Sequence, residues 1–404
     1  MTIIAGSFVS RQRGRRFGGP GVKDLSESRV LVVDDAQANV AVLVEALRGE
    51  YKLSVALDGE GALRQIEKSP PDIVLLDIVM PGIDGYEVCR RIRAHEALRD
   101  LPVMFLSSLE DAHDKARGFE VGGNDYVTKP FEALEVRARV GSLLRAKAYA
   151  DAVKEALARD MRIAREIQMG LLPADIAAAT AGSGLDVAAL LEPARAVGGD
   201  LYEVLRPSAD RLFVALGDVS GKGIPAALFM AVTMTLMRTM ARQHDDPAVI
   251  LRGVNDELVA QNPRQMFVTL QCAVFDLARG RVTAASAGHS PAIVLSRGKA
   301  PRQAFSATGR VLGMMPDNPV TSESMELAPG DTLLFFSDGV TEAFDETQEL
   351  LGDEKLLAHL AEQPGAGAAE TVQSVLGLVR AHAGRAKQSD DISIVASRFD
   401  PASR

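Results

Sequence analysis

The chain has 404 residues, of which 47% are hydrophobic and 25% charged, and its 54 acidic and 45 basic side chains leave a formal net charge of −9. This balance excludes a mostly disordered or collagen-like chain, and because one domain usually takes about 100–200 residues, the length predicts two domains. The acidic charge disfavours nucleic acid as a partner, and with no run of about 18 apolar residues and no secretory signal we expect neither a membrane span nor export.

A basic segment opens the chain, with five cationic residues and several glycines. It has few periodic apolar positions, which predicts that residues 1–27 form a disordered tail. We favour a solvated tail over a site for phosphate or acidic partners, because charge runs are usually solvated. The cationic residues are Arg11, Arg13, Arg15, Arg16 and Lys23.

Residues 28–148 alternate apolar runs with helical patterns. The runs are continuous rather than alternating, which is typical of parallel strands buried on both faces. Five such units predict a doubly wound α/β domain with a five-stranded parallel sheet, whose functional site lies beyond the carboxyl ends of its strands. The expected strands are residues 29–35, 52–57, 72–77, 102–108 and 125–130, and the expected helices are residues 39–47, 61–68, 85–95 and 114–122, with a final helix after them.

A charged helical stretch follows at residues 149–172 and ends at Pro173. Its apolar residues recur every three or four positions and therefore share one face of a helix. This pattern predicts a helical linker that either forms a two-helix coiled coil between protomers or packs on one of its own domains. The residues of the face are Val153, Leu157, Met161, Ala164, Ile167 and Leu171.

Residues 173–404 change to many short strands interrupted by longer helices. Strands that pair with each other, with helices placed outside, predict an α+β sandwich with flanking helices. The expected strands are residues 185–194, 201–208, 210–218, 267–277, 281–288, 291–296, 331–339 and 391–399, and the expected helices are residues 224–243, 247–261 and 370–383.

Three carboxylates stand at strand ends in the first domain: Asp34 and Asp35 end the first strand, and Asp77 ends the third. Parallel neighbours place all three at one edge of the sheet. Crowded carboxylates repel each other and are stabilised by a hard cation such as Mg²⁺. Lys129, after the fifth strand, would offset the charge of a phosphoryl group, and its bond to Pro130 is a position where a cis peptide can occur.

This set resembles the receiver domain of two-component response regulators. The resemblance implies that Asp34 and Asp35 hold Mg²⁺, and that Asp77 both contacts the ion and accepts phosphate from a histidine kinase. It further implies that Ser107 is the switch hydroxyl, Tyr126 the switch aromatic residue and Lys129 the phosphate partner.

A second set of acids lies in the second domain, each at or near the end of an apolar strand and most beside glycine. Glycine lets a backbone carbonyl approach closely enough to serve as a metal ligand. With 6 histidines and 2 cysteines in the chain, a zinc site is disfavoured, whereas a carboxylate cage suits two Mg²⁺ or Mn²⁺ ions that activate a hydroxide for attack on a phosphoryl group. The acids are Asp200, Asp218, Asp338, Asp390 and Asp391.

Two features of the second domain have simpler interpretations. The segment GDVSGKG at residues 217–223 lacks the spacing of a nucleotide P-loop, which we therefore reject. His289, in AGHSP, taken alone is better interpreted as a core histidine than as a catalytic one.

In order along the chain, GGD, GDVSGKG, AGHSP, SDGVTEA and DDI together resemble the metal-dependent PPM phosphatases of the SpoIIE type. The resemblance implies that Asp200, Asp218, Asp338 and Asp390 hold two Mn²⁺ or Mg²⁺ ions with the Val219 carbonyl, with Asp200 and Asp218 central to catalysis. Asp391 and His289 would then lie outside the direct ligands. Glu203 stands where the family often has aspartate, so a metal role for it is doubtful.

Taken together, the motifs predict a response regulator whose receiver controls a serine/threonine protein phosphatase. The resemblance implies an upstream histidine kinase and a phosphorylated anti-anti-sigma (STAS) protein as substrate, and we also expect a homodimer. The alternative is a non-catalytic adaptor that sequesters a partner; a DNA-binding regulator is disfavoured because no helix-turn-helix pattern appears. Two distant cysteines, Cys89 and Cys272, favour a reducing, cytoplasmic setting.

Overall fold

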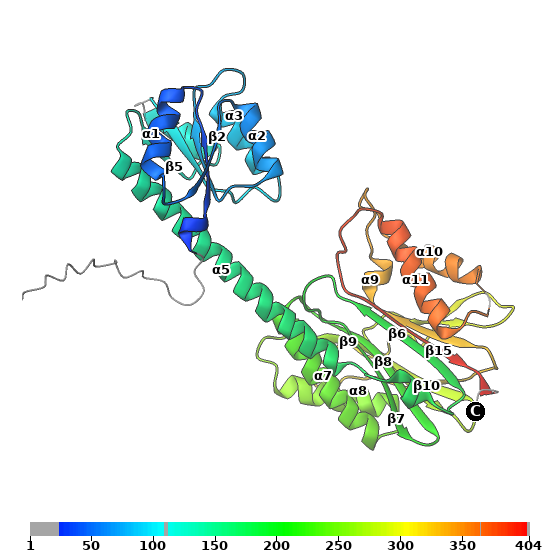
Figure 1. Cartoon of the computed structure of the whole chain (residues 1–404). Helices are drawn as coiled ribbons and strands as arrows, with labels where there is room; N and C mark the ends of the chain where they lie inside the picture. Colours follow the sequence, from blue (N-terminus) through cyan, green and yellow to red (C-terminus); the bar gives the residue numbers. More distant parts are fainter. Residues whose placement is uncertain (1–23, 109–111, 364, 402–404) are drawn as a thin grey trace, which may run out of the picture. The chain divides into compact units, whose positions relative to one another are not determined.

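The computed structural model describes residues 24–108, 112–363 and 365–401, in two compact units, Met1–Ala158 and Arg159–Arg404 (Figure 1). Most of the predicted basic tail lies outside the described residues. From residue 24 onward the chain forms a short 3₁₀ helix, η1 (Leu25–Glu27), capped by the Asp24 carboxylate, and enters the first strand.

The first unit contains a five-stranded, wholly parallel sheet in the order β2-β1-β3-β4-β5, which confirms the predicted doubly wound fold. Its strands and helices are β1 (Arg29–Val33), α1 (Gln37–Leu47), β2 (Lys52–Ala56), α2 (Gly59–Lys68), β3 (Ile73–Asp77), α3 (Gly85–Ala94), β4 (Val103–Ser107), α4 (Ala112–Glu120) and β5 (Asp125–Thr128).

Helices cover both faces of the sheet in the first unit, and successive side chains of each strand point to opposite faces. Leu31 and Val33 of β1 join a core with α2 and α3, whereas Val30 and Val32 join a core with α1 and the start of helix α5 (Ala133–Leu171). This double burial is the physical reason that the strands are continuous apolar runs in the sequence.

Helix α5 has 39 residues and is continuous, so the expected final helix of the first domain and the expected linker helix form a single element (Figure 1). Val136, Val140 and Leu144 are buried in the first unit, and Gln168 is buried in the second. Between them, Val153 and Leu157 are 49% and 58% exposed.

The second unit contains two antiparallel five-stranded sheets, in the orders β13-β10-β9-β8-β7 and β12-β11-β14-β15-β6. The strands are β6 (Leu185–Glu192), β7 (Leu201–Ser208), β8 (Arg211–Val219), β9 (Val268–Asp276), β10 (Arg281–Ala287), β11 (Ala292–Leu295), β12 (Arg302–Ala304), β13 (Glu323–Glu326), β14 (Thr332–Phe336) and β15 (Ile392–Phe399). The helices are α6 (Ile176–Thr180), α7 (Ile224–Gln243), α8 (Pro247–Ala260), α9 (Asp338–Thr341), α10 (Gly352–Ala361) and α11 (Ala368–Ala383).

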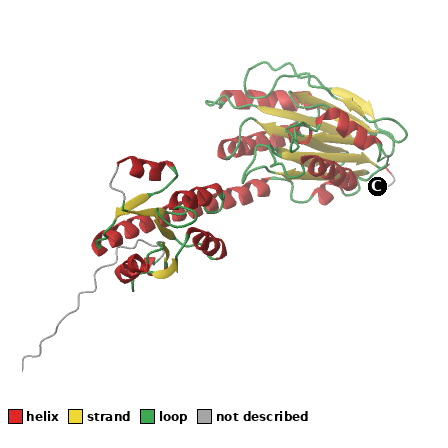
Figure 2. Cartoon of the chain, turned by 90° about the horizontal axis from the view of Figure 1, so that it is seen from above, coloured by secondary structure: helices red, strands yellow, loops and turns green. Residues whose placement is uncertain are grey.

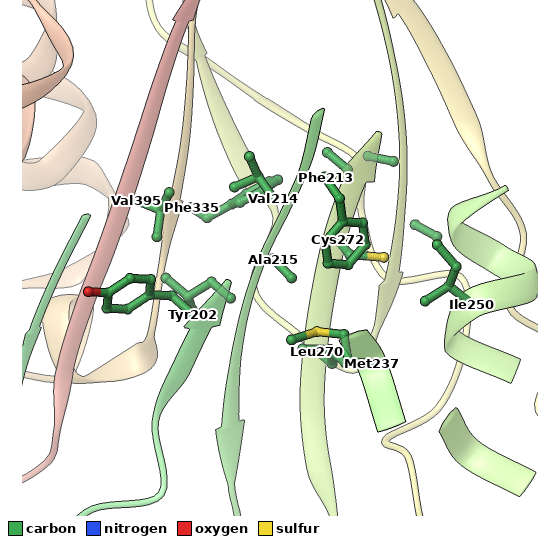
Figure 3. Close-up of a cluster of buried hydrophobic side chains, with 14 of the residues drawn as sticks. Tyr202, Phe213, Val214, Ala215, Met237, Ile250, Leu270, Cys272, Phe335 and Val395 are labelled. Atoms are coloured by element: carbon green, nitrogen blue, oxygen red, sulfur yellow. The ribbon is translucent and has the colours of Figure 1, made fainter. Parts of the chain in front are cut away.

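The two sheets stack face to face, with helices on their outer faces (Figure 2), as the sequence predicts. One core joins α7 and α8 to the β7–β8–β9 side and extends between the sheets; Figure 3 shows Phe335 and Val395 at one side of it and Met237 and Ile250 at the other. A second core packs α10 and α11 on the outer face of β14 and β15.

Among the described helices, α7 alone is long and apolar enough to cross a membrane by length and composition. Its Met230, Met234 and Met237 are buried, and the helix packs on β7 and β8. The apolar sequence of α7 therefore reflects its place in the core of the second unit. Cys89 and Cys272 are both buried free thiols.

Candidate functional site

The three strand-end acids of the first unit meet at the carboxyl edge of its sheet. Asp34, Asp35 and Asp77 each place a carboxylate oxygen within 4.8 Å of the others. Asp34 and Asp77 are buried and Asp35 is exposed, so the cluster is open to solvent on one side. An open group of three carboxylates is suited to a hard divalent cation that keeps some of its water.

Lys129 closes the other side of this cluster. Its ammonium nitrogen lies 2.8 Å from Asp34 Oδ2 and 2.8 Å from Asp77 Oδ2. Burial raises the pKa of Asp77, although its hydrogen bond with Lys129 opposes that shift. For Lys129, burial acts to lower the pKa, but the hydrogen bonds and charges of the two aspartates raise it overall. The lysine is therefore held charged beside the carboxylate that we expect to accept phosphate.

The expected switch residues lie around the same edge. Ser107 ends β4 and is buried, and its carbonyl accepts a hydrogen bond of 2.7 Å from the Lys129 backbone amide. Tyr126, on β5, stacks edge-to-face with the exposed ring of Phe119, with ring centres 5.9 Å apart. The Lys129–Pro130 peptide is cis. Ser107 and Lys129 thus lie beside the acidic cluster, and Tyr126 is on the neighbouring strand.

In the second unit, each sheet delivers acids to the same end of the sandwich. Asp200 immediately precedes β7 and Asp218 is next to last in β8, while Asp338 opens α9 after β14 and Asp390 lies just before β15. The charges of Asp338 and Asp390 both act on Asp218, and Asp218 acts on Asp200. The structure therefore places these four acids, up to 190 residues apart in the sequence, near enough for their charges to interact.

Electrostatic strain is concentrated on Asp200 and Asp218. Burial, followed by the charge of Asp218, raises the pKa of Asp200 well above its usual range. Burial and the charge of Asp338 raise the pKa of Asp218 to about 7. Asp200 Oδ2 is buried and has no hydrogen-bond partner among the described residues. Buried polar atoms are normally paired, so an orphaned carboxylate oxygen among other acids points to a cation as its partner.

The donor set fits a pair of Mg²⁺ or Mn²⁺ ions, because its donors are carboxylate and carbonyl oxygens. The Val219 carbonyl oxygen would lie 2.5 Å from a Cβ atom at Gly199, so any side chain at Gly199 would push this oxygen away. The predicted role of glycine in admitting a backbone carbonyl thus has a direct counterpart here.

Asp391 has a different environment from its neighbour Asp390. Its Oδ1 accepts a hydrogen bond of 2.8 Å from the Ala194 amide, and its Oδ2 accepts one of 2.8 Å from the Gly199 amide. A Cβ atom at Gly198 would lie 1.9 Å from the same carboxylate. Asp391 therefore holds the loop that carries Asp200, whereas Asp390 faces Lys222, whose ammonium nitrogen lies 2.8 Å from Asp390 Oδ2.

Glu203 points away from the acid cage. It is buried and forms an ion pair with Arg238 of α7, which also donates to the Leu171 carbonyl at the end of α5. Burial raises the pKa of Glu203 although Arg238 opposes the shift. None of these contacts gives Glu203 a metal role, as its departure from the family pattern suggested. Glu203 and Arg238 instead link β7 to α7 and to the end of α5.

His289 is a buried link between the two sheets. Its Nδ1 lies 2.8 Å from Thr269 Oγ1 on β9, and its Nε2 lies 3.1 Å from the Phe336 carbonyl on β14. A carbonyl can only accept, so Nε2 carries the proton and Nδ1 accepts from Thr269. Burial lowers the pKa of His289 to about 4. These contacts fit the interpretation of a core histidine.

We expect His289 to make the second unit sensitive to mild acid. Because the folded-state pKa is lowered, an unfolded chain takes up a proton below about pH 6.5 that the folded chain refuses until about pH 4, so stability is lost as the pH falls through that window. Between about pH 7 and pH 5 this amounts to ~2 kcal/mol, or a drop in Tm of roughly 4–8 °C. Calorimetry should show that His289→Gln removes this component; an equal drop in both proteins would contradict it.

Gln168, near the end of α5, is a residue that the sequence pattern did not single out. It is 4% exposed, its Nε2 donates to the Gly198 carbonyl at 2.7 Å, and its Oε1 accepts from the Gly198 amide at 3.1 Å. Gly198 lies two residues before Asp200. Helix α5 thus holds the backbone that positions a candidate metal ligand. The only signal for Gln168 in the sequence was its position between Ile167 and Leu171 of the apolar helix face.

Two family models match the chain, one in each unit. Residues 30–141 match the response regulator receiver domain, and residues 208–400 match stage II sporulation protein E (SpoIIE). The second match includes Asp218, Asp338, Asp390 and the loops that carry them.

Curated relatives cover parts of the chain. Response regulator PleD of Caulobacter vibrioides is 40% identical over 137 residues, which are 34% of this chain and 30% of PleD. Protein IcfG of a Synechocystis species is 28% identical over 275 residues, which cover 61% of this chain and 43% of IcfG. The chain therefore spans less than half the length of these relatives. In fold, it is similar to the SiaA-PP2C domain of Pseudomonas aeruginosa, with a TM-score of 0.55 and 24% identity over 62% of this chain and 99% of that domain.

Proposed function

Because the chain joins a response regulator receiver domain to a SpoIIE-type PP2C phosphatase domain, we propose that it is a metal-dependent phosphoserine/phosphothreonine protein phosphatase controlled by phosphorylation of Asp77. The observation that carries the catalytic part is the acid cage, in which Asp200 is buried and Asp218, Asp338 and Asp390 are partly exposed. Asp200 has an orphaned carboxylate oxygen, and Asp218 has a pKa of about 7 because it is partly buried beside Asp338. Such a cage is costly to fold unless cations occupy it.

In this proposal Asp200, Asp218, Asp338 and Asp390 hold two Mn²⁺ or Mg²⁺ ions together with the Val219 carbonyl. The ions would supply a hydroxide nucleophile at neutral pH and positive charge for the phosphoryl oxygens. Asp391 fixes the loop that carries Asp200 through its two backbone hydrogen bonds. Lys222 lies at the rim of the cage and adds a cation where the phosphoryl group would enter.

The receiver would act through helix α5. In the structure, the ammonium of Lys129 bridges Asp34 and Asp77. A phosphoryl group on Asp77 would add negative charge beside this ammonium, and the changed charge balance would shift the conformation of the surrounding loops. Residues 149–171 of α5 would serve as the linker. The end of the helix contacts the loop that carries Asp200 through Gln168, and it contacts α7 through the Leu171 carbonyl and Arg238. The exposed Val153 and Leu157 suit pairing of this helix with a second copy in a homodimer.

We expect Gln168→Ala to weaken metal binding and catalysis together. Loss of its two hydrogen bonds to Gly198 frees the loop that carries Asp200, and residues that orient metal ligands typically contribute about 10–100-fold to affinity or activity. Mn²⁺ titration by calorimetry and phosphate release would measure both. Glu166→Ala is the matched control, because Glu166 is exposed on the same helix and should leave both values unchanged. Equal Mn²⁺ affinity and equal phosphate release in the two variants would show that Gln168 does not position the loop that carries Asp200.

The proposed substrate is a phosphorylated anti-anti-sigma protein of the STAS type, in a partner-switching pathway, and the proposed phosphate donor for Asp77 is a histidine kinase. We place the protein in the cytoplasm, where Mg²⁺ would occupy the receiver. The resemblance of the sequence motifs to SpoIIE-type phosphatases supports the substrate class. Incubation of the full chain and Mn²⁺ with a serine-phosphorylated STAS protein, followed by phosphate release and intact mass, tests it.

The rival function is a receiver-controlled adaptor that binds its partner without chemistry. The cage favours the enzyme, because an adaptor has no need for four converging acids with an orphaned oxygen. Binding of the phosphorylated STAS protein without phosphate release, at any Mn²⁺ concentration, would establish the adaptor instead.

A further inference from the structure

A cavity of about 340 Å³ opens beside the acid cage of the phosphatase domain. Gly339, which follows Asp338, and Ser389, which precedes Asp390, both line it. Adjacent Cα atoms are about 3.8 Å apart, so the cavity shares a wall with the proposed metal site. None of the residues that line it is one of the expected metal ligands.

The cavity combines an apolar surface with a cationic rim. Phe344, Val379 and Ile392 contribute the apolar part, and Arg380 and Lys387 contribute the cations. Glu192 is the single acid among the described lining residues, and Arg380 Nη2 contacts both of its carboxylate oxygens at 3.0 Å. Lys387 is exposed and forms no ion pair within the part of the chain that the structure describes. One positive charge of the rim is thus uncompensated.

The segment that carries Lys387 is tied to the cage. Gln388 Nε2 donates to the Glu192 and Asp390 carbonyls, both at 2.8 Å. Lys222 Nζ donates to the Ser389 carbonyl at 2.7 Å. These bonds fix the backbone that directly follows Lys387, so the base of its side chain has a defined place relative to the proposed metal site.

We propose that this cavity is a substrate subsite that receives an acidic side chain close to the phosphoserine or phosphothreonine. The inference rests on the proposed phosphatase function and adds a specificity determinant to it. The substrate's phosphoryl group goes to the cage, and a neighbouring glutamate or aspartate pairs with Lys387 while its methylene groups cover the apolar surface. A basic side chain at the same position meets Lys387 with like charge and is disfavoured.

Phosphoserine peptides that differ only in Glu, Gln or Lys at one flanking position test this subsite. With the full chain and Mn²⁺, we expect kcat/KM for a Glu peptide to exceed that for its Gln partner by about two- to fivefold at one or more positions, as an accessible charge pair allows. In Lys387→Glu the preference reverses and the Lys peptide becomes the better substrate. The ratio of rates is insensitive to general damage, because damage lowers the rates for all peptides alike.

Arg385→Glu is the matched control, since Arg385 is an exposed cation of the same segment that does not line the cavity, and it should keep the Glu preference. An unchanged preference in Lys387→Glu, or no Glu preference at any position in the wild type, would overturn the subsite. If the wild type hydrolyses neither the peptides nor 4-nitrophenyl phosphate, the proposed function itself fails and this inference fails with it.

Discussion

Replacing Asp218 with asparagine is expected to lower phosphate release from a serine-phosphorylated protein by about a thousandfold, the scale on which groups that stabilise charge at the reaction centre act. Asp218 interacts electrostatically with both Asp200 and Asp338. Asparagine keeps the shape but not the charge, so the cage loses the attraction that holds its cations.

The same variant should stabilise the metal-free protein. Burial and Asp338 raise the pKa of Asp218 to about 7, so the folded chain loses stability as the pH rises from about 4 to 7 and this carboxyl ionises in an acidic surrounding. A neutral amide at this position has no such cost. Above neutral pH and without metal, we therefore expect Asp218→Asn to raise the free energy of unfolding by on the order of a few kcal/mol, and with it Tm. The variant should lose most of the stabilisation by Mn²⁺.

Calorimetry with and without Mn²⁺, together with phosphate release, gives both readouts for Asp218→Asn. Asp210→Asn is a suitable control, because Asp210 is an exposed acid in the turn between β7 and β8. Wild-type rates in Asp218→Asn, or equal Mn²⁺ stabilisation in the variant and the wild type, would refute the assignment of Asp218 to the metal cage.

Asp77→Asn should abolish phosphorylation of the receiver and every response of the phosphatase to it. Asp77 is buried, and Lys129 lies 2.8 Å from its carboxylate, so an amide at this position removes the carboxylate that we expect to accept phosphate. Acetyl phosphate should add one phosphoryl group to the wild type, seen by intact mass, and none to the variant. Phosphate release by the variant should be the same with and without acetyl phosphate.

Glu96→Gln, an exposed acid of the same unit, should be phosphorylated like the wild type. Incorporation of phosphate by Asp77→Asn would instead place the acceptor elsewhere in the cluster, on Asp34 or Asp35.

The features that could be predicted from the sequence are those that follow from burial and from strand ends. Continuous apolar runs such as residues 72–77 are typical of strands covered on both faces, and the observed β3 is wholly buried. Acids that directly follow parallel strands must meet at the carboxyl edge of the sheet, so the proximity of Asp34 and Asp77 could be predicted without a structure. The Asp200 and Asp218 motifs stand next to strands for the same reason.

Edge strands, a short helix and the full length of α5 were harder to predict. β12 and β13 were missed because these short edge strands are mostly exposed and have no apolar alternation. α10 was also missed, since its ten residues have only two buried leucines, Leu356 and Leu360. The two expected helices form the single helix α5, because no glycine or proline stands near the expected boundary at residues 148 and 149.

Contacts between polar side chains and distant backbone could not be predicted at all. Gln168 looks like a solvent-facing residue of an amphipathic helix, yet it is buried against Gly198. Lys222 belongs to a segment that superficially suggests a nucleotide loop, and its partner Asp390 lies 168 residues away. Spacing within a sequence carries no information on such pairs, which depend on how the two sheets are stacked.

Control of the phosphatase by the receiver is tested most directly by comparing the rates of phosphate release with and without an analogue of the receiver's phosphoryl group. Phosphate release from a serine-phosphorylated STAS protein should be measured with Mn²⁺, with and without beryllofluoride, over a range of concentrations of the full chain. We expect beryllofluoride to change the rate in the wild type and to leave the rate of Asp77→Asn unaffected. Identical wild-type rates in both states at every concentration would contradict it.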